Sequence, residues 1–137
     1  LLIPDFILDA LEGKDLVVYG DESLVQSLCF ISDMIDGMVR LMHAGPEISI
    51  VNLGHDTPVR MVDVANDIIQ MTHSSSRVVF EKPLEFLTAK GIPNLTRAKE
   101  ELGWLPLVRL DEGLQKTIDY TIANKEMLGL NGSQIQS

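Results

Sequence analysis

The sequence has few of the features that mark secreted, membrane-spanning or nucleic-acid-binding proteins. Its 137 residues include a single cysteine, which excludes an internal disulfide and fits a reducing compartment. Acidic residues outnumber basic ones by 20 to 11, so the net charge is −9 and no basic stripe is available for nucleic acid. Apolar runs stay well short of the ~18–20 residues that cross a bilayer. We therefore expect a cytoplasmic protein without a membrane or nucleic-acid partner.

The sequence also lacks the usual arrangements of catalytic and metal-binding residues. His43, His55 and His73 are scattered without metal-ligand spacing, and we interpret them as surface residues. Cys29 lies in an apolar run, which favours a buried structural thiol over a nucleophile. No Gly-rich turn joins a strand to a helix, so the phosphate cradle of a dinucleotide site is missing. We assign no catalytic, cofactor-binding or metal-binding residue to this chain.

Hydrophobic periodicity predicts short strands mixed with helices. The expected strands span residues 16–19, 28–31, 48–53 and 77–80. The expected helices span residues 4–13, 32–43, 60–72, 94–103 and 111–127, with Asn94 and Asp111 as the caps of the last two. Because strands and helices do not alternate regularly, the predicted fold class is α/β of the mixed, α+β kind. We expect one domain over residues 1–130, followed by a flexible polar tail over residues 131–137.

The helix expected at residues 32–43 is amphipathic. Its apolar residues share one face at 3.6-residue spacing: Met34, Ile35, Met38, Val39, Leu41 and Met42. At its start Ser32 and Asp33 offer side-chain oxygens, and we interpret Asp33 as a helix cap rather than as half of a catalytic carboxylate pair with Asp36. Trp104, which follows the predicted helix end at Gly103, is interpreted as a structural residue that packs across the fold.

Several stretches together resemble a known family. Residues 18–33, from Val18-Tyr-Gly-Asp to Ile-Ser-Asp33, are similar to Val-Tyr-Gly-Asp-Gly-x-x-x-Arg-x-Phe-x-Tyr-Val-x-Asp of the extended short-chain dehydrogenase/reductases. Asn52-Leu-Gly54 resembles the Asn-Ile-Gly strand end of that family, and Pro93 to Pro106 resembles its Pro-Asp-x-x-Lys-Ala-x-x-x-Leu-Gly-Trp-x-Pro motif. The resemblance covers about residues 1–127 and is greatest for the UDP-glucuronate decarboxylases within the family.

The resemblance implies a C-terminal substrate-binding subdomain of an NAD-dependent nucleotide-sugar epimerase, dehydratase or decarboxylase. A Rossmann half that binds NAD would precede Leu1 in a longer parent protein, and any homodimer would form through that half. The Tyr-x-x-x-Lys pair of the family is missing, since Tyr19 is followed four residues on by Ser23 and Tyr120 by Asn124. We expect this chain alone to bind no NAD, to catalyse no reaction, and to expose an apolar patch where the Rossmann half docks.

The resemblance also places a UDP-sugar site on five residues. Val18 and Tyr19 would give backbone hydrogen bonds and an apolar wall to the nucleotide base, although Tyr19 could equally close the edge of the core. Asn52 would reach the phosphate or the sugar, or else satisfy the turn that follows its strand. Gln26 stands where the family has a diphosphate-binding arginine, and it brings no charge. Lys90, or Lys82, could supply the missing cation.

Other departures weaken the diphosphate site. Glu22 replaces a family glycine beside the same turn, and neither Ala89 nor Gly91 provides the second arginine of the family. Two alternatives therefore stay open, namely a non-catalytic nucleotide-sugar-binding module and a structural relic whose site is lost. The upstream coding sequence would discriminate between them and a fragment of an enzyme.

Overall fold

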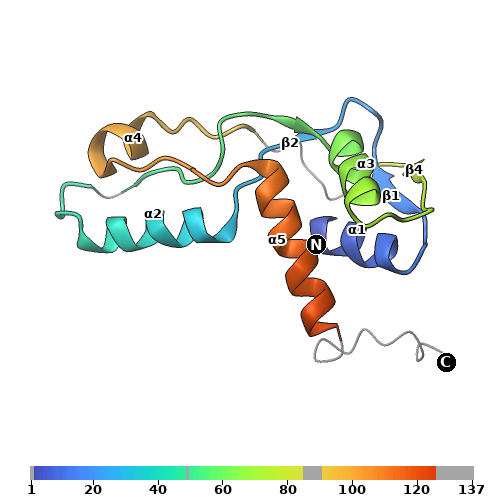
Figure 1. Cartoon of the computed structure of the whole chain (residues 1–137). Coiled ribbons are helices and arrows are strands. Elements are labelled where there is room, and N and C mark those ends of the chain that lie inside the picture. The colour runs from blue at the N-terminus through green and yellow to red at the C-terminus, as the bar shows by residue number, and fades with distance from the viewer. Residues whose placement is uncertain (1, 49, 85–90, 126–137) are drawn as a thin grey trace, which may run out of the picture.

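The computed structural model describes residues 2–48, 50–84 and 91–125. Its elements, in chain order, are α1 (Leu2–Leu11), β1 (Leu16–Tyr19), β2 (Val25–Gln26), α2 (Ile31–His43), β3 (Val59–Arg60), α3 (Met61–Met71), β4 (Val78–Glu81), α4 (Thr96–Leu102) and α5 (Leu110–Asn124). Figure 1 shows two regions: a lobe made of α1, β1, α3, β4 and α5, and an arm made of α2, α4 and the loops beside them. The predicted mixed α/β class is confirmed.

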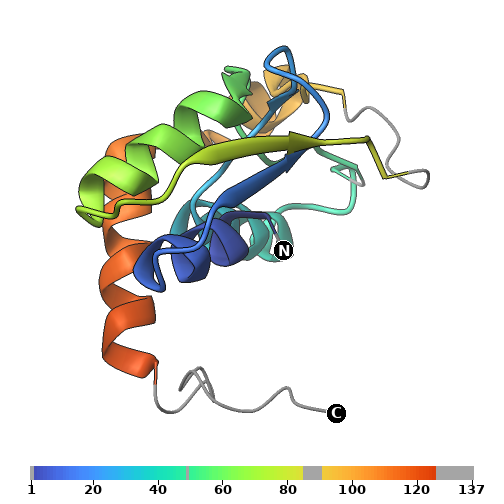
Figure 2. The ribbon, with the colours of Figure 1, turned by 90° about the vertical axis from the view of Figure 1, so that its right-hand side faces the viewer.

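The lobe is built on a parallel pair of strands, β1 and β4, which lie side by side in Figure 2. Leu16 pairs with Val78 and Tyr19 with Glu81, while Leu16 and Val18 turn inward onto the helices. Eleven described residues form its core: Phe6, Ile7, Ala10, Leu16, Val18, Met61, Val64, Ala65, Ile68, Leu114 and Ile118. Full burial of one such aliphatic side chain stabilises the fold by ~1.5–3 kcal/mol.

Most helices of the structure follow the predicted periodicity. Helix α3 buries the residues expected from their spacing, and β4 begins one residue later than expected. Gly13, after α1, and Gly103, at the end of α4, have φ of 69° and 59°, the left-handed conformation that glycine adopts most easily. The N-cap of α4 is Leu95 and not the predicted Asn94, whose side chain accepts a hydrogen bond from the Thr96 backbone N–H at 2.9 Å. The expected ends at Met127 and the tail over 131–137 lie outside the described residues.

Two predicted strands are wrong. Residues 28–30 form no strand, and Ile31 already begins α2. Leu28 packs against the core of the lobe, Cys29 against the core of the arm, and Phe30 against α5, so the apolar run is buried without a neighbouring strand. A Cβ at Gly113 of α5 would lie 3.1 Å from the Phe30 ring, so glycine allows this approach. The described part of residues 48–53 is also irregular. There, Arg97 donates a side-chain hydrogen bond to the Ile50 carbonyl at 2.7 Å, in a place where a strand would need a neighbouring backbone.

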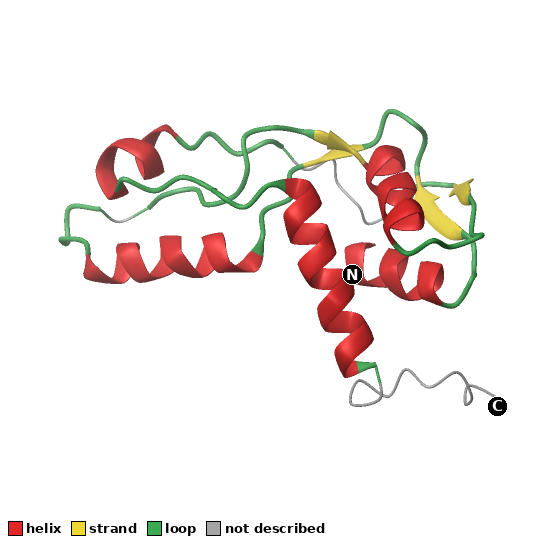
Figure 3. Ribbon diagram, viewed as in Figure 1, coloured by secondary structure: helices red, strands yellow, loops and turns green. Residues whose placement is uncertain are grey.

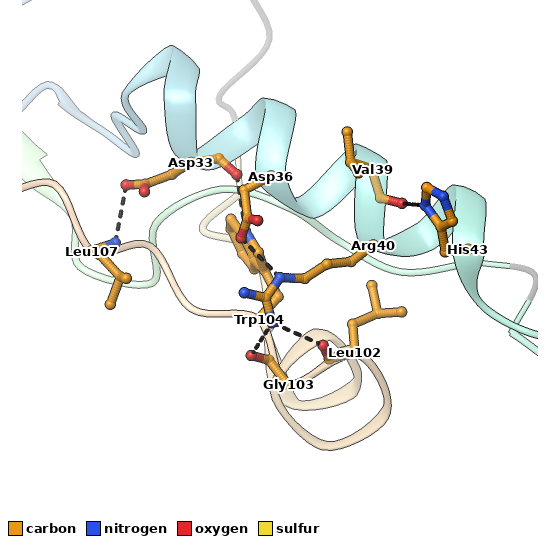
Figure 4. A network of polar contacts seen from close by, with 9 residues as sticks. All are labelled: Asp33, Asp36, Val39, Arg40, His43, Leu102, Gly103, Trp104 and Leu107. Atoms are coloured by element: carbon orange, nitrogen blue, oxygen red, sulfur yellow. Dashed lines mark hydrogen bonds and ion pairs between the residues drawn. The ribbon is translucent and has the colours of Figure 1, made fainter.

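The predicted capping roles of Ser32, Asp33 and Asp111 are wrong as well. Helix α2 is capped by Phe30, without a side-chain hydrogen bond, and Asp33 lies buried within the first turn. The Asp33 carboxylate accepts a hydrogen bond from the backbone N–H of Leu107 at 3.0 Å, as Figure 4 shows, and another from that of Val108 at 2.9 Å. The Trp104 indole donates to the Asp33 carbonyl at 2.9 Å. Asp33 therefore holds the segment after α4 against α2. Asp111 is not the cap of α5 either, because it lies inside that helix, one residue past its start.

Trp104 is fully buried, which confirms its structural interpretation. With Leu95 and Ala98 it forms the small core of the arm, and Leu53 packs against this cluster. Gly37 faces the same cluster from α2, where a Cβ would come within 2.7 Å of a Leu53 methyl group. The packed face of α2 thus carries a carboxylate and a glycine. Four of the six residues of the predicted apolar face point to solvent, namely Ile35, Met38, Val39 and Met42, whereas Met34 and Leu41 are half-buried.

Candidate functional site

A cavity of about 400 Å³ lies where the arm meets the short antiparallel pair β2–β3. Its walls come from β2 and the residues after it, from the start of α2, and from two loops: Gln26, Ser27, Cys29, Met34, Leu53, Gly54, Gly91 and Pro93. Most of these residues belong to, or directly adjoin, the three stretches that carry the family resemblance, namely residues 18–33, 52–54 and 93–106. Within the first stretch, the cavity is lined by its second half and not by Val-Tyr-Gly-Asp itself. Residues separated by up to 67 positions in the sequence therefore share one cavity.

Two contacts hold the loops of this cavity together. The Ser27 hydroxyl donates to the His55 carbonyl at 2.6 Å and accepts from the His55 backbone N–H at 3.2 Å. Gly54 has φ of 158°, and a Cβ there would lie 3.0 Å from the Pro93 ring. A side chain at position 54 would be strained by its backbone conformation and would press on Pro93. The Gly of the Asn-Leu-Gly motif therefore lets the two loops close over the cavity.

The structure brings some of the predicted site residues to this cavity. Gln26 lines it, and so does Gly91, the second position where the resemblance expects an arginine. Asn52 precedes the lining residue Leu53, and its amide donates a hydrogen bond to the Asn94 carbonyl at 3.2 Å. That bond joins two loops that are 42 positions apart in the sequence, so it differs from the local turn role weighed as the alternative for Asn52. Lys90 lies outside the described residues.

Val18 and Tyr19 lie elsewhere. Val18 is fully buried in the lobe core, so its side chain is not accessible to a ligand. Tyr19 ends β1, is half-buried, and pairs with Glu81 of β4. Neither residue lines the 400 Å³ cavity. Their assignment to a nucleotide base stays a prediction, as do the ligand contacts of Gln26, Asn52 and Lys90.

The charges near the cavity are engaged in pairs. Lys99 of α4 bonds to Asp56 at 2.7 Å and holds the pKa of that carboxyl below its usual value. Arg97 makes a two-armed contact with Glu101, at 2.7 and 3.0 Å, which lowers the Glu101 pKa. The described part of the cavity wall contains no charged side chain. The described part of this wall therefore offers hydrogen bonds and apolar contact to a ligand.

A second cavity, of about 750 Å³, was not predicted from the sequence. It lies between α1, residues 28–31 and the start of α5, and its wall is mainly apolar. Cys29 lines both cavities. Partial burial, reinforced by the Asp33 carboxylate, raises the pKa of the Cys29 thiol, which disfavours the thiolate needed of a nucleophile. Residues 28–31, which line this cavity, form a continuous apolar run in the sequence. The run indicates burial, but it predicts a buried strand and not a cavity wall.

Other kinds of site find no support in residues 2–48, 50–84 and 91–125. No three His, Cys, Asp or Glu side chains in these ranges gather as they would around a metal ion. None of the helices there combines the length and the apolar character needed to span a bilayer.

Comparisons with known proteins place the chain in a wider context. It is 36% identical over 119 residues to UDP-glucuronic acid decarboxylase 1 of Xenopus tropicalis, a match that covers 87% of this chain and 28% of the relative. Among solved structures, it is similar to an epimerase of Methanothermobacter thermautotrophicus, with a TM-score of 0.89 and 23% identity over 96% of this chain and 40% of that one.

A UDP-glucuronic acid 4-epimerase of Bacillus cereus, solved with UDP-glucuronic acid and NAD, gives a TM-score of 0.82 at 22% identity, over 90% of this chain and 40% of that one. No family model matches the chain. The chain spans between about a quarter and two fifths of these proteins. It thus belongs to the extended short-chain dehydrogenase/reductase family, where it corresponds to a C-terminal portion with a likeness to the UDP-glucuronate decarboxylases.

Proposed function

We propose that the chain is the substrate-binding C-terminal portion of an NAD-dependent nucleotide-sugar decarboxylase, or of an epimerase or dehydratase of the same family. The observation that carries this proposal is the 400 Å³ cavity, since three motif-bearing segments converge on it. Similarity to UDP-glucuronic acid decarboxylase 1 across 87% of the chain favours a UDP-sugar as the ligand. The single cysteine agrees with a cytoplasmic location.

NAD bound in the parent protein would supply reversible hydride transfer at C4 of the sugar, the chemistry that decarboxylation, epimerisation and dehydration would share. The N-terminal portion of the parent protein would hold NAD and the residues that move protons. The part assigned to this chain is to bind and orient the nucleotide sugar and to shield it from water.

The solvent-facing side of α2 supports the docking of that N-terminal portion. Five apolar residues on it are exposed, by 45–80%: Ile31, Ile35, Met38, Val39 and Met42. Ile31 also lines the 750 Å³ cavity, so the apolar face of α2 continues into that cavity. A contiguous apolar surface of this kind marks a protein interface. Covering both features with the N-terminal portion would bury α2 on its second side and close the cavity.

Activity and binding together test this proposal. The complete polypeptide that contains this chain and the 137-residue chain are each titrated with UDP-glucuronate and with NAD, and products are followed by mass spectrometry. We expect both ligands to bind the complete polypeptide and to be turned over. For the chain alone, we expect no NAD binding. Micromolar NAD affinity of the chain alone, or a complete polypeptide that ignores UDP-sugars, would overturn the proposal.

A non-catalytic binding module is the second candidate, and one observation favours it. Gln26 and Gly91, two of the three positions where the resemblance could place an arginine, both line the cavity and are both uncharged, and the third, Ala89, is uncharged as well. A module of this kind would bind UDP-glucuronate in the complete polypeptide without turning it over.

A further inference from the structure

We infer that the 750 Å³ cavity receives an apolar segment of the N-terminal portion that carries a lysine or an arginine, and that this cation pairs with Asp67. The inference rests on the proposed function, which supplies the N-terminal portion, and it adds the chemistry of the segment that enters the cavity. Such a segment has two parts: an apolar body that fills the space, and one positive charge placed at the carboxylate in the wall.

The apolar body is argued from the wall and from what lies next to it. Apolar side chains from three elements form much of the wall, among them Ile3 of α1, Phe30 at the start of α2 and Leu110 of α5. Through Ile31, which is 62% exposed, the wall continues onto the solvent-facing apolar side of α2. A small ligand could fill the cavity without reaching that side of the helix. A polypeptide segment can cover both surfaces, which is what a contiguous exposed apolar surface indicates.

The positive charge is argued from Asp67, whose carboxylate lies in the same wall and is exposed in this chain. Partial burial raises the pKa of Asp67, and the nearby carboxylates of Asp63 and Asp111 raise it further. Asp63 lies one turn earlier on α3, and Asp111 lies at the start of α5, so like charges approach Asp67 from two elements. The electrostatic potential at this point of the wall is therefore negative, and it favours a cation.

The two neighbouring carboxylates already have cations of their own. Arg60 pairs with Asp63 at 2.8 Å, and Arg109 pairs with Asp111 at 3.0 Å. Asp67 differs from both, because among the described residues no hydrogen bond or ion pair engages its side chain. It is thus the carboxylate of this wall that is open to a cation from outside the chain.

Closure of the cavity makes that cation necessary. A segment that fills the apolar space removes water from the wall and, with it, the hydration of the Asp67 carboxylate. A desolvated carboxylate is strongly unfavourable unless a cation or hydrogen-bond donors replace the water. A lysine or arginine on the entering segment provides this replacement, and it links the position of the segment to one residue of α3.

The first test measures how well the cavity is covered. Hydroxyl-radical oxidation of Phe30 and Leu110, which line the cavity, is compared between the 137-residue chain and the complete polypeptide. We expect several-fold slower oxidation in the complete polypeptide. Both proteins contain every segment of this chain, so protection that is found only in the complete polypeptide comes from the N-terminal portion.

The variants are made in the complete polypeptide. Asp67→Lys should bring the oxidation of Phe30 close to the rate of the chain alone, because the reversed charge repels the entering cation. Asp63→Lys is the matched control: it makes the same change of charge one turn earlier on α3, at an exposed residue outside the described wall, and should leave the protection in place. Protection that survives Asp67→Lys, or a cavity that is unprotected in the wild type, would overturn the inference.

A second measurement needs no variant and holds even if Asp67→Lys folds poorly. The side-chain carboxyl resonance of Asp67 is followed against pH in both proteins. A paired cation lowers the pKa of an aspartate by about 1–3 pH units, so we expect the pKa of Asp67 to be lower in the complete polypeptide by a shift of this size. A pKa that is unchanged or higher there would show a carboxylate without a cation, and would overturn the inference.

Titration of the same complete polypeptide with UDP-glucuronate and NAD separates this inference from the proposed function. Binding of both ligands together with an unpaired Asp67 would overturn the inference and leave the proposed function standing. A paired Asp67 in a polypeptide that binds neither ligand would overturn the proposed function and support the docking segment.

Discussion

The lobe and the arm are stabilised in different ways. The lobe encloses eleven buried apolar residues between three helices and a parallel strand pair. The arm has a core of three buried residues and consists largely of loop between two helices, as Figure 3 shows. Its longer helix, α2, turns its apolar side outward. The lobe therefore has the composition of a self-sufficient fold, whereas the arm has that of one side of an interface.

Polar contacts replace the missing apolar burial of the arm. Asp33 accepts two backbone hydrogen bonds from the segment that follows α4. Arg40 of α2 donates to the Gly103 carbonyl at 2.9 Å, where the negative end of the α4 dipole favours a cation (Figure 4). Such bonds fix geometry, and hydrogen bonds to charged groups contribute ~1.5–3 kcal/mol each, still less than the burial of a full apolar core. The account thus predicts that the arm can unfold while the lobe stays folded.

Removing the central side chain of each region should have the largest effect. Trp104→Ala and Ile68→Ala each empty a fully buried site, at a cost of about 3–5 and 2–5 kcal/mol respectively. Hydrogen exchange should show that Trp104→Ala exposes the amides of α2 and α4 while those of α1 and α3 stay protected. Ile68→Ala should instead lower protection across the whole lobe. Loss of protection in both regions from Trp104→Ala would mean that lobe and arm fold as one unit.

The polar fastening of the arm should give a smaller effect. Asp33→Ala leaves the backbone N–H groups of Leu107 and Val108 without their acceptor, which should cost about 1–3 kcal/mol. Asp36→Ala on the same helix removes only an exposed pair with Arg40, worth about 0.3–0.5 kcal/mol. Urea unfolding followed by the single tryptophan measures both. Equal losses for the two variants would contradict the role assigned to Asp33.

The smallest effect concerns Asp67, in the wall of the larger cavity on the lobe. Partial burial, with the carboxylates of Asp63 and Asp111, raises the pKa of Asp67. The folded state then holds this proton more tightly than the unfolded state, so stability is lost as pH rises through the folded pKa. Asp67→Asn should gain less than about 0.5 kcal/mol at neutral pH, and the gain should vanish in acid. Asp63→Asn, which loses its pair with Arg60, should not gain.

The same division explains which elements the sequence could predict. The spacing of Val64, Ala65 and Ile68 predicts α3 because these residues pack inside the lobe. The run from Leu28 to Ile31 signals burial but not its partner, and within the described residues no strand pairs with it. The sequence predicts Asp33 as a helix cap, which is wrong. Its carboxylate instead accepts hydrogen bonds from Leu107 and Val108, which lie 74 and 75 positions further along the chain. Periodicity reports local pattern and says nothing of such distant partners.

The candidate site shows the same limit. The family resemblance singled out Gln26 and Gly91 separately, and the structure places both in one cavity. The lining by Met34 and Cys29 could not be predicted, since it depends on how the arm folds back beside β2. Nor could the sequence predict the hydrogen bond from Asn52 to Asn94, because the two residues are 42 positions apart.

The most direct test of the central claim compares methionine oxidation in the 137-residue chain and in the complete polypeptide. Met38 and Met42 are 54% and 80% exposed on the apolar face of α2, and Met61 is fully buried in the lobe as an internal control. At concentrations too low for self-association, hydroxyl radicals should oxidise Met38 and Met42 rapidly in the chain alone and slowly in the complete polypeptide. Met61 should be protected in both. Equally fast oxidation of Met42 in the two proteins would show that no N-terminal portion covers α2, and would contradict the account.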